Sequence, residues 1–231
     1  MAETAHAIGT NGFKRVIFGI LDDDENVVDT VYVDEKNGGS IELKTSGFAG
    51  QSNTVYASNI AYYVSDAGTG TGKVTLTILE MPHDVATKVL GDVYENKVYL
   101  TKSDTKQPYV AMIAESQDLD GNPMWVGIGK AKFTTEDAID LKTAEEKGMT
   151  PTNISLTGSA ITRKKDKLVK AKATSSDGAA LSDFAKAVFP GFTGDLDNPT
   201  SASSSTPASS SASSTPASST TSSTPASTKG A

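Results

Sequence analysis

The sequence predicts a mainly β protein in which two packed antiparallel sheets form a β-sandwich or barrel, with one or two flanking α-helices and a disordered C-terminal tail. Alternating apolar positions rich in β-branched and aromatic residues run through most of the chain, and turn-forming residues separate them. Strand and helix patterns do not alternate, as they would in a parallel sheet. The stretch from Pro199 to Ala231 contains only Ser, Thr, Pro and Ala apart from Lys229 and Gly230.

The strand pattern begins with a hairpin, because Phe13–Leu21 and Val27–Val33 flank the acidic turn Asp22–Asn26. The alternation is clearest in Lys73–Leu79, where Val74, Leu76 and Ile78 share one face. The other predicted strands are Asn53–Val64, Lys97–Thr101, Tyr109–Glu115, Pro123–Thr134, Asn153–Arg163 and Leu168–Thr174.

Two segments have helical signals. Pro82–Leu90 has Pro in its first turn and Gly91 placed for a C-cap. Ala179–Phe189 has an apolar face and stops before Pro190. For Thr135–Glu146 the sequence leaves two alternatives, a short helix and an irregular loop.

The chain divides into a β domain over residues 1–198, with an N-terminal arm over 1–12, and a tail over 199–231. The tail repeats Thr-Pro-Ala-Ser at 206, 215 and 224 and has almost no apolar surface to offset the entropy of ordering. It is interpreted as a linker or solubilising tail. A glycosylated stalk and an adhesive surface remain open.

Composition excludes several classes. Without cysteine there is no disulfide framework, thiolate metal site or Cys nucleophile. The formal net charge of −7 argues against a general nucleic-acid clamp. No apolar run approaches the ~20 residues of a membrane span. The N-terminal residues Met1–Thr10 do not show the basic start and apolar segment of a signal peptide. These features predict a soluble protein made in the cytoplasm.

No catalytic, cofactor-binding or metal site is predicted. The stretch Gly68–Val74 is near a phosphate-binding loop, but Val74 replaces the required Ser or Thr and Lys73 opens a strand. The acidic turns around Asp22–Glu25 and Asp118–Asp120 lack full Ca²⁺-loop spacing.

The sequence offers few side chains for zinc binding or for hydrolytic catalysis. Only His6 and His83 are available for zinc or for a Ser-His-Asp triad. A glycosidase pair among the 28 acids has no identifiable members. Trp125 and the pair Tyr62-Tyr63 are interpreted as core or subunit-interface packing, with a carbohydrate platform as the alternative.

A series of short segments is informative when taken in order. The series comprises Tyr56–Asn59, Tyr62-Tyr63, Gly68–Gly70 leading into Val74–Leu79, Pro82–Gly91, Pro108–Met112, Gly121, Gly127–Phe133, Leu141–Glu146 and Val188–Phe192. Together, across residues 10–192, they resemble the major tail proteins of siphoviruses, the long-tailed phages, that infect Gram-positive bacteria. The Ser/Thr/Pro-rich tail departs from that family, in which an extra C-terminal module is often immunoglobulin-like.

The resemblance implies a structural virion protein, assembled in the host cytoplasm, whose hexameric rings stack into a hollow tail tube. It implies further copies of itself, the tape-measure protein, and the tail-terminator and distal tail proteins as partners. Genomic DNA would pass through the lumen without specific binding, and an acidic lumen would repel its phosphates. No membrane, cofactor or enzymatic activity is implied.

A tube also needs extensions that reach neighbouring subunits. The segment 34–53 is predicted to be a long inter-subunit loop because four glycines accompany only three sizeable apolar residues. Its candidate contact residues are Gly38, Gly39, Ile41, Leu43, Phe48 and Gly50. Deletion of Gly38–Gly50 is expected to leave a folded monomer that no longer polymerises. A wide hairpin loop with no partner is the alternative.

Two other functions stay open at this stage. One is a secreted carbohydrate-binding β-sandwich with a mucin-like linker, which would need an exposed aromatic platform. The other is an acidic glycosidase domain.

Overall fold

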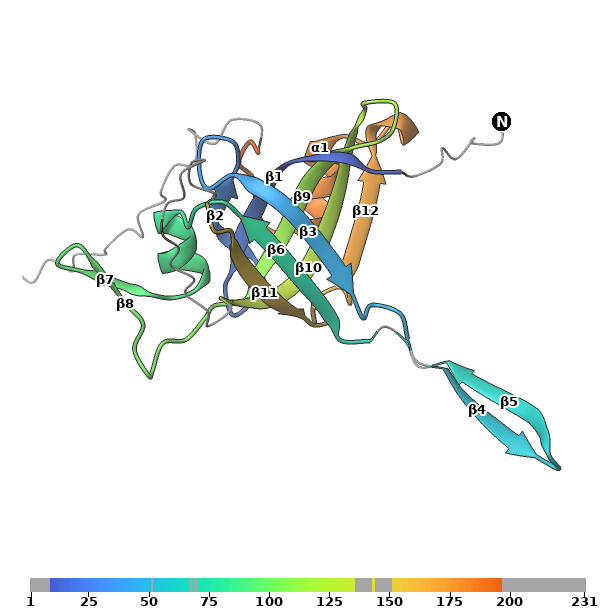
Figure 1. The fold of residues 1–231 in the computed structure, drawn as a ribbon. Coiled ribbons are helices and arrows are strands. Elements are labelled where there is room, and N and C mark those ends of the chain that lie inside the picture. Colours follow the sequence, from blue (N-terminus) through green and yellow to red (C-terminus); the bar gives the residue numbers. More distant parts are fainter. Residues whose placement is uncertain are drawn as a thin grey trace, which may run out of the picture.

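Figure 1 shows the computed structural model of the chain, which describes residues 9–196 apart from 51, 67, 69, 136–142 and 144–150. Three predictions therefore fall largely or wholly outside the described residues. They concern the N-terminal arm, the segment Thr135–Glu146 and the C-terminal tail.

Strands dominate the described part of the chain. They are β1 (Asn11–Leu21), β2 (Val27–Val33), β3 (Ser40–Ser46), β4 (Ser52–Ala57), β5 (Ile60–Asp66), β6 (Gly72–Ile78), β7 (Val93–Glu95), β8 (Val98–Leu100), β9 (Val110–Gln117), β10 (Pro123–Thr135), β11 (Ile154–Ala160) and β12 (Lys170–Thr174). The helical segments are η1 (Val85–Val89), η2 (Ser175–Asp177) and α1 (Leu181–Val188).

One antiparallel strand path forms the body, in the order β2-β1-β9-β10-β11-β6-β3, with β12 also paired to β10. The first part of β10 pairs with β9 and β12, and its last part pairs with β11. Its register shifts between Ile128 and Ala131, and such an irregularity bends a strand. β10 thus carries the path from one layer into the other, and the predicted mainly β fold with packed antiparallel sheets is confirmed.

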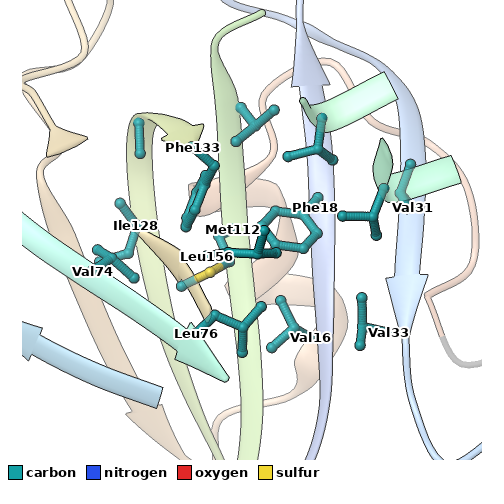
Figure 2. Packing of buried hydrophobic residues seen from close by; sticks show 14 of the residues in the cluster. Val16, Phe18, Val31, Val33, Val74, Leu76, Met112, Ile128, Phe133 and Leu156 are labelled. Atoms are coloured by element: carbon teal, nitrogen blue, oxygen red, sulfur yellow. The ribbon is translucent and has the colours of Figure 1, made fainter. Parts of the chain in front are cut away.

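The main core fills the space between these layers. Val16, Phe18 and Met112, from β1 and β9, lie opposite Leu76 and Leu156, from β6 and β11 (Figure 2). All five side chains are fully buried. The cluster also includes Val85 and Val89 of η1, so the predicted helix over Pro82–Leu90 is confirmed in a shorter form.

A second cluster lies on the outer face of β1, β9 and β10, where α1 covers the sheet. The predicted apolar face of α1 is buried, and Phe184 stacks on Trp125 with ring centroids 6.2 Å apart. The helix α1 and the strand β10 approach each other closely at Gly127, where a Cβ would lie 2.5 Å from Cγ2 of Val188. The helix predicted over Ala179–Phe189 is therefore confirmed.

The prediction of a single strand over Asn53–Val64 is wrong, because this segment folds back on itself as the hairpin β4–β5. Ser58 and Asn59 form its turn, with φ angles of 52° and 65°. Two successive residues with positive φ match the twist of a two-residue hairpin turn. Such turns usually contain Gly, and its absence hid the turn from the sequence pattern.

The prediction of a loop throughout 34–53 is also wrong, because residues 40–46 form β3. This strand pairs with β6 from Ser40↔Ile78 to Ser46↔Lys73, and half-buried Leu43 packs against the main core. Only Ile41 and Leu43 of its seven residues are apolar, so the strand pattern was weak. Deletion of Gly38–Gly50 would remove an end strand of the sheet path, so it no longer isolates assembly from folding.

Candidate functional site

The β4–β5 hairpin extends away from the two-layered body (Figure 1). It forms a separate two-stranded sheet. No Asp, Glu, Lys or Arg occurs between Gln51 and Ser65. Its exposed large apolar and aromatic residues are Val55, Tyr56, Ile60, Tyr62, Tyr63 and Val64. An uncharged, apolar extension of this kind marks a contact surface for another molecule.

Close backbone packing defines the base of this hairpin. Gly47, with a φ of 74°, approaches the carbonyl of Thr71, and a Cβ on Gly72 would lie 2.3 Å from the ring of Phe48. Phe48 also packs against the main core, and Lys170 lies over its ring at 5.2 Å. Phe48 therefore anchors the point at which the hairpin leaves the body.

The six candidate contact residues do not form one surface. Gly38 and Gly39 lie in the turn before β3, where Gly38 faces Pro82. Leu43 points to the core and Phe48 to the hairpin base, whereas Ile41 and Gly50 are exposed. Their predicted inter-subunit role stays a prediction.

A second hairpin with exposed aromatic residues is β7–β8, which follows η1. Its turn, Asn96-Lys97, has φ angles of 53° and 65°. Tyr94 and Tyr99 are directly opposite each other, with ring centroids 4.7 Å apart. The imidazole of His83 packs on Tyr94 at 4.8 Å, and its Nδ1 lies 2.7 Å from the hydroxyl of Tyr99.

The carboxylates of the acidic turns accept hydrogen bonds from the protein's own backbone amides and lysine side chains. The buried carboxylate of Glu25 accepts hydrogen bonds from Lys130 Nζ at 2.5 Å and from the amide of Lys165 at 2.9 Å. Burial raises the pKa of Glu25, but the hydrogen bonds and the positive charge of Lys130 outweigh it, so that pKa is lowered.

Asp118 closes its own turn. Its carboxylate accepts hydrogen bonds from Ser176 Oγ at 2.5 Å and from the amides of Asp120 and Asn122 at 3.0 and 2.8 Å. The Ser176 bond, followed by the bonds within the turn, lowers the pKa of Asp118 to about 2. Within the described residues, no three His, Asp or Glu side chains are grouped to hold a metal ion.

The other sequence candidates are placed as follows. Lys73 is a strand residue of β6, so no helix follows the glycine-rich stretch before it. Trp125 is only 5 % exposed and packs under α1, so it cannot form a carbohydrate platform. His6 lies outside the described residues. No helix in the described ranges is both long enough and apolar enough to cross a membrane.

The family of the chain follows from its match to a protein-family model. The model for phage tail tube protein matches residues 7–197. The chain belongs to the phage tail tube protein family. No curated protein matches it significantly.

As a tail tube protein, the chain has a structural role in the virion tail, and the predicted resemblance to major tail proteins is confirmed at the level of the family. In this tail tube protein two hairpins carry exposed apolar and aromatic residues. Sequence reasoning placed the contact loop at 34–53 and missed the adjacent hairpin. The uncharged run from Gln51 to Ser65 was the signal that could have found it.

Proposed function

We propose that the chain is the major tail-tube subunit of a siphophage. Its copies form hexameric rings, and the rings stack into a hollow tube through which genomic DNA leaves the virion. The observation that carries this proposal is the β4–β5 hairpin of a tail tube family member, which exposes six large apolar or aromatic residues outside its own core. Exposing such a surface is unfavourable unless another molecule covers it, and a tube provides further copies of the same chain.

The sheet edges and the charge support the same function. The strand path ends at β2 and β3, and pairing with neighbouring subunits would remove such edges. With a formal net charge of −7, the chain suits a conduit that repels phosphates, so that DNA passes through without specific binding. The tape-measure protein in the lumen and the tail-terminator and distal tail proteins at the two ends complete the proposed set of partners.

Negative-stain electron microscopy of the purified, concentrated protein tests the proposal. Rings or hollow tubes of uniform width are expected without any other phage protein. Dispersed particles at every concentration would contradict self-assembly by this chain.

Two matched variants separate the hairpin from general surface effects. Tyr62→Ser removes a 77 % exposed aromatic residue from β5, and Leu119→Ser removes a 72 % exposed residue from the turn after β9. Both variants should fold, since neither side chain is in the core. Only Tyr62→Ser is expected to abolish tubes, because hot-spot residues concentrate the binding free energy. Equal assembly by both variants would exclude the hairpin tip as a contact.

A further inference from the structure

Tyrosines are distributed unevenly over this molecule. Of its seven tyrosines, five lie on the two hairpins outside the main sheets. Tyr56, Tyr62 and Tyr63 are on β4–β5, while Tyr94 and Tyr99 are on β7–β8, and all five are exposed. Tyrosine is enriched at protein interfaces because a large apolar ring ends in a polar hydroxyl.

The β7–β8 surface is already organised. We define the aromatic cluster as His83, Tyr94 and Tyr99. Its three rings contact one another, with centroids 4.7 to 5.6 Å apart, and the His83–Tyr99 polar contact holds two of them in place. Such a preorganised surface loses little side-chain entropy when a partner binds.

The two hairpins project from opposite ends of the body, β7–β8 at the left and β4–β5 at the lower right of Figure 1. One molecule therefore cannot bring its own two surfaces together. Two copies can, through a head-to-tail contact in which different surfaces meet. Such a contact repeats from copy to copy and generates a ring or an open polymer.

We propose that the tip of the β4–β5 hairpin of one copy docks on the aromatic cluster of the next copy. This inference rests on the proposed tube function and names the partner surface of the hairpin. The tip supplies Tyr56, Tyr62 and Ile60 without any charge that would have to be desolvated. The cluster supplies ring faces together with polar His and Tyr atoms.

The charged side chains near the cluster are Glu95 and Lys97 of the hairpin, Lys102 after β8, and Asp84, which follows His83. Glu95 and Lys102 are 3.8 Å apart at their charged atoms, and both side chains are about half exposed. An apolar centre with a solvated charged rim is the usual composition of a protein interface. A second copy of this chain is thus the occupant that the chemistry of both surfaces fits.

Cysteine cross-linking tests the docking directly, because the chain contains no native cysteine. The double variant Ala57→Cys/Thr101→Cys, whose exposed positions lie beside the tip residues and the aromatic cluster and leave their tyrosines in place, is oxidised at concentrations at which the wild type forms tubes, and it is then run on a non-reducing gel. A ladder of covalent multimers is expected, whether it stops at a closed ring or continues. Each single variant should remain largely monomeric. Ala57→Cys/Leu119→Cys, whose second position is exposed but far from the aromatic cluster in sequence, is the matched control and should give no ladder.

The outcomes separate the docking from the tube function. Wild-type tubes without a ladder would overturn the docking and leave the tube function standing. Disulfide dimers of a single variant alone would also overturn it, because they would show contact between like surfaces. The absence of both tubes and ladder would contradict the tube function itself.

Alanine substitution gives a second readout. Tyr94→Ala and Tyr62→Ala should each raise the protein concentration needed for tubes by about tenfold or more. The double substitution should add little to either single one, since both remove the same contact. Fully additive effects would overturn the pairing of these two surfaces.

Discussion

The guanidinium of Arg163 is completely buried at the end of α1. It donates hydrogen bonds to the carbonyl oxygens of Ala187 at 2.7 Å and Val188 at 2.6 Å, and it forms an ion pair with Asp166 at 2.5 Å. The last carbonyls of a helix have no partners within the helix and carry partial negative charge. A single cation therefore caps α1 and joins it to the β11–β12 connection.

Replacement of this cation should strongly destabilise the fold. Arg163→Met leaves two helix-end carbonyls without their donor, and we expect a loss of about 1–3 kcal/mol in unfolding free energy, because the Asp166 carboxylate is partly exposed to water. Lys186→Met breaks an exposed pair with Asp183 and should change it by less than about 1 kcal/mol. Urea unfolding followed by circular dichroism measures both. A similar small change in both variants would show that the cap does not stabilise α1.

Two aspartates make stability sensitive to acid. The hydrogen bond from Ser176 lowers the pKa of Asp118, and the hydrogen bonds from Arg163 lower that of Asp166, each to about 2. In the unfolded chain an Asp titrates near 3.9. Their stabilisation is therefore present above about pH 4 and is lost as pH falls toward about 2, because the unfolded chain binds protons first.

The test is a series of thermal unfolding curves from pH 5 to pH 2. The melting temperature of the wild type should fall between pH 4 and pH 2. Asp118→Asn should have a lower melting temperature at pH 5 and a smaller fall, since one of the two titrating groups is gone. An undiminished acid-induced fall in this variant would assign the transition to other carboxylates.

Among the secondary-structure elements, some strands could be predicted from the sequence and others could not. The strand β6 follows from strict alternation, since one of its faces lies in the main core. The strands β1, β2 and β10 follow from their apolar and β-branched residues, since they contribute to both hydrophobic clusters. β3 and the turn Ser58-Asn59 did not follow, because tertiary pairing and backbone twist decide them. For the same reason the sequence pattern did not predict the β4–β5 hairpin, whose turn contains no Gly.

The packing of α1 on β10 depends on the absence of a side chain at Gly127. Gly127→Ala adds a Cβ that would lie 2.5 Å from Val188 Cγ2 and 3.1 Å from Phe184 Cζ, so α1 would have to shift away from β10. Overpacking of this kind lowers stability by about 1–3 kcal/mol. Gly68→Ala is the control, because a Cβ there meets nothing within 4 Å. Chemical denaturation of both variants distinguishes a local clash from a general effect of alanine, and equal stabilities would mean that α1 adapts freely.

At the scale of the whole molecule, assembly sets apolar attraction against like-charge repulsion. Each copy carries a formal net charge of −7, whereas the hairpin proposed to join copies carries none from Gln51 to Ser65. Repulsion between copies is screened by salt, with a Debye length of about 10 Å at 0.1 M and about 3 Å at 1 M. Apolar contacts are not weakened in this way.

Salt should therefore promote tube formation. Raising sodium chloride from about 0.05 to about 0.5 M should lower the protein concentration at which tubes pellet on ultracentrifugation, because screening reduces repulsion between copies. The Tyr62→Ser variant should remain soluble at both concentrations, since screening cannot replace the lost contact. The opposite result, tubes that dissolve as salt rises, would indicate that charge pairs hold the copies together. The basic stretch Lys164–Lys172 would then be the surface to reverse in charge, since it places five cations beside one acidic residue in a chain of net negative charge.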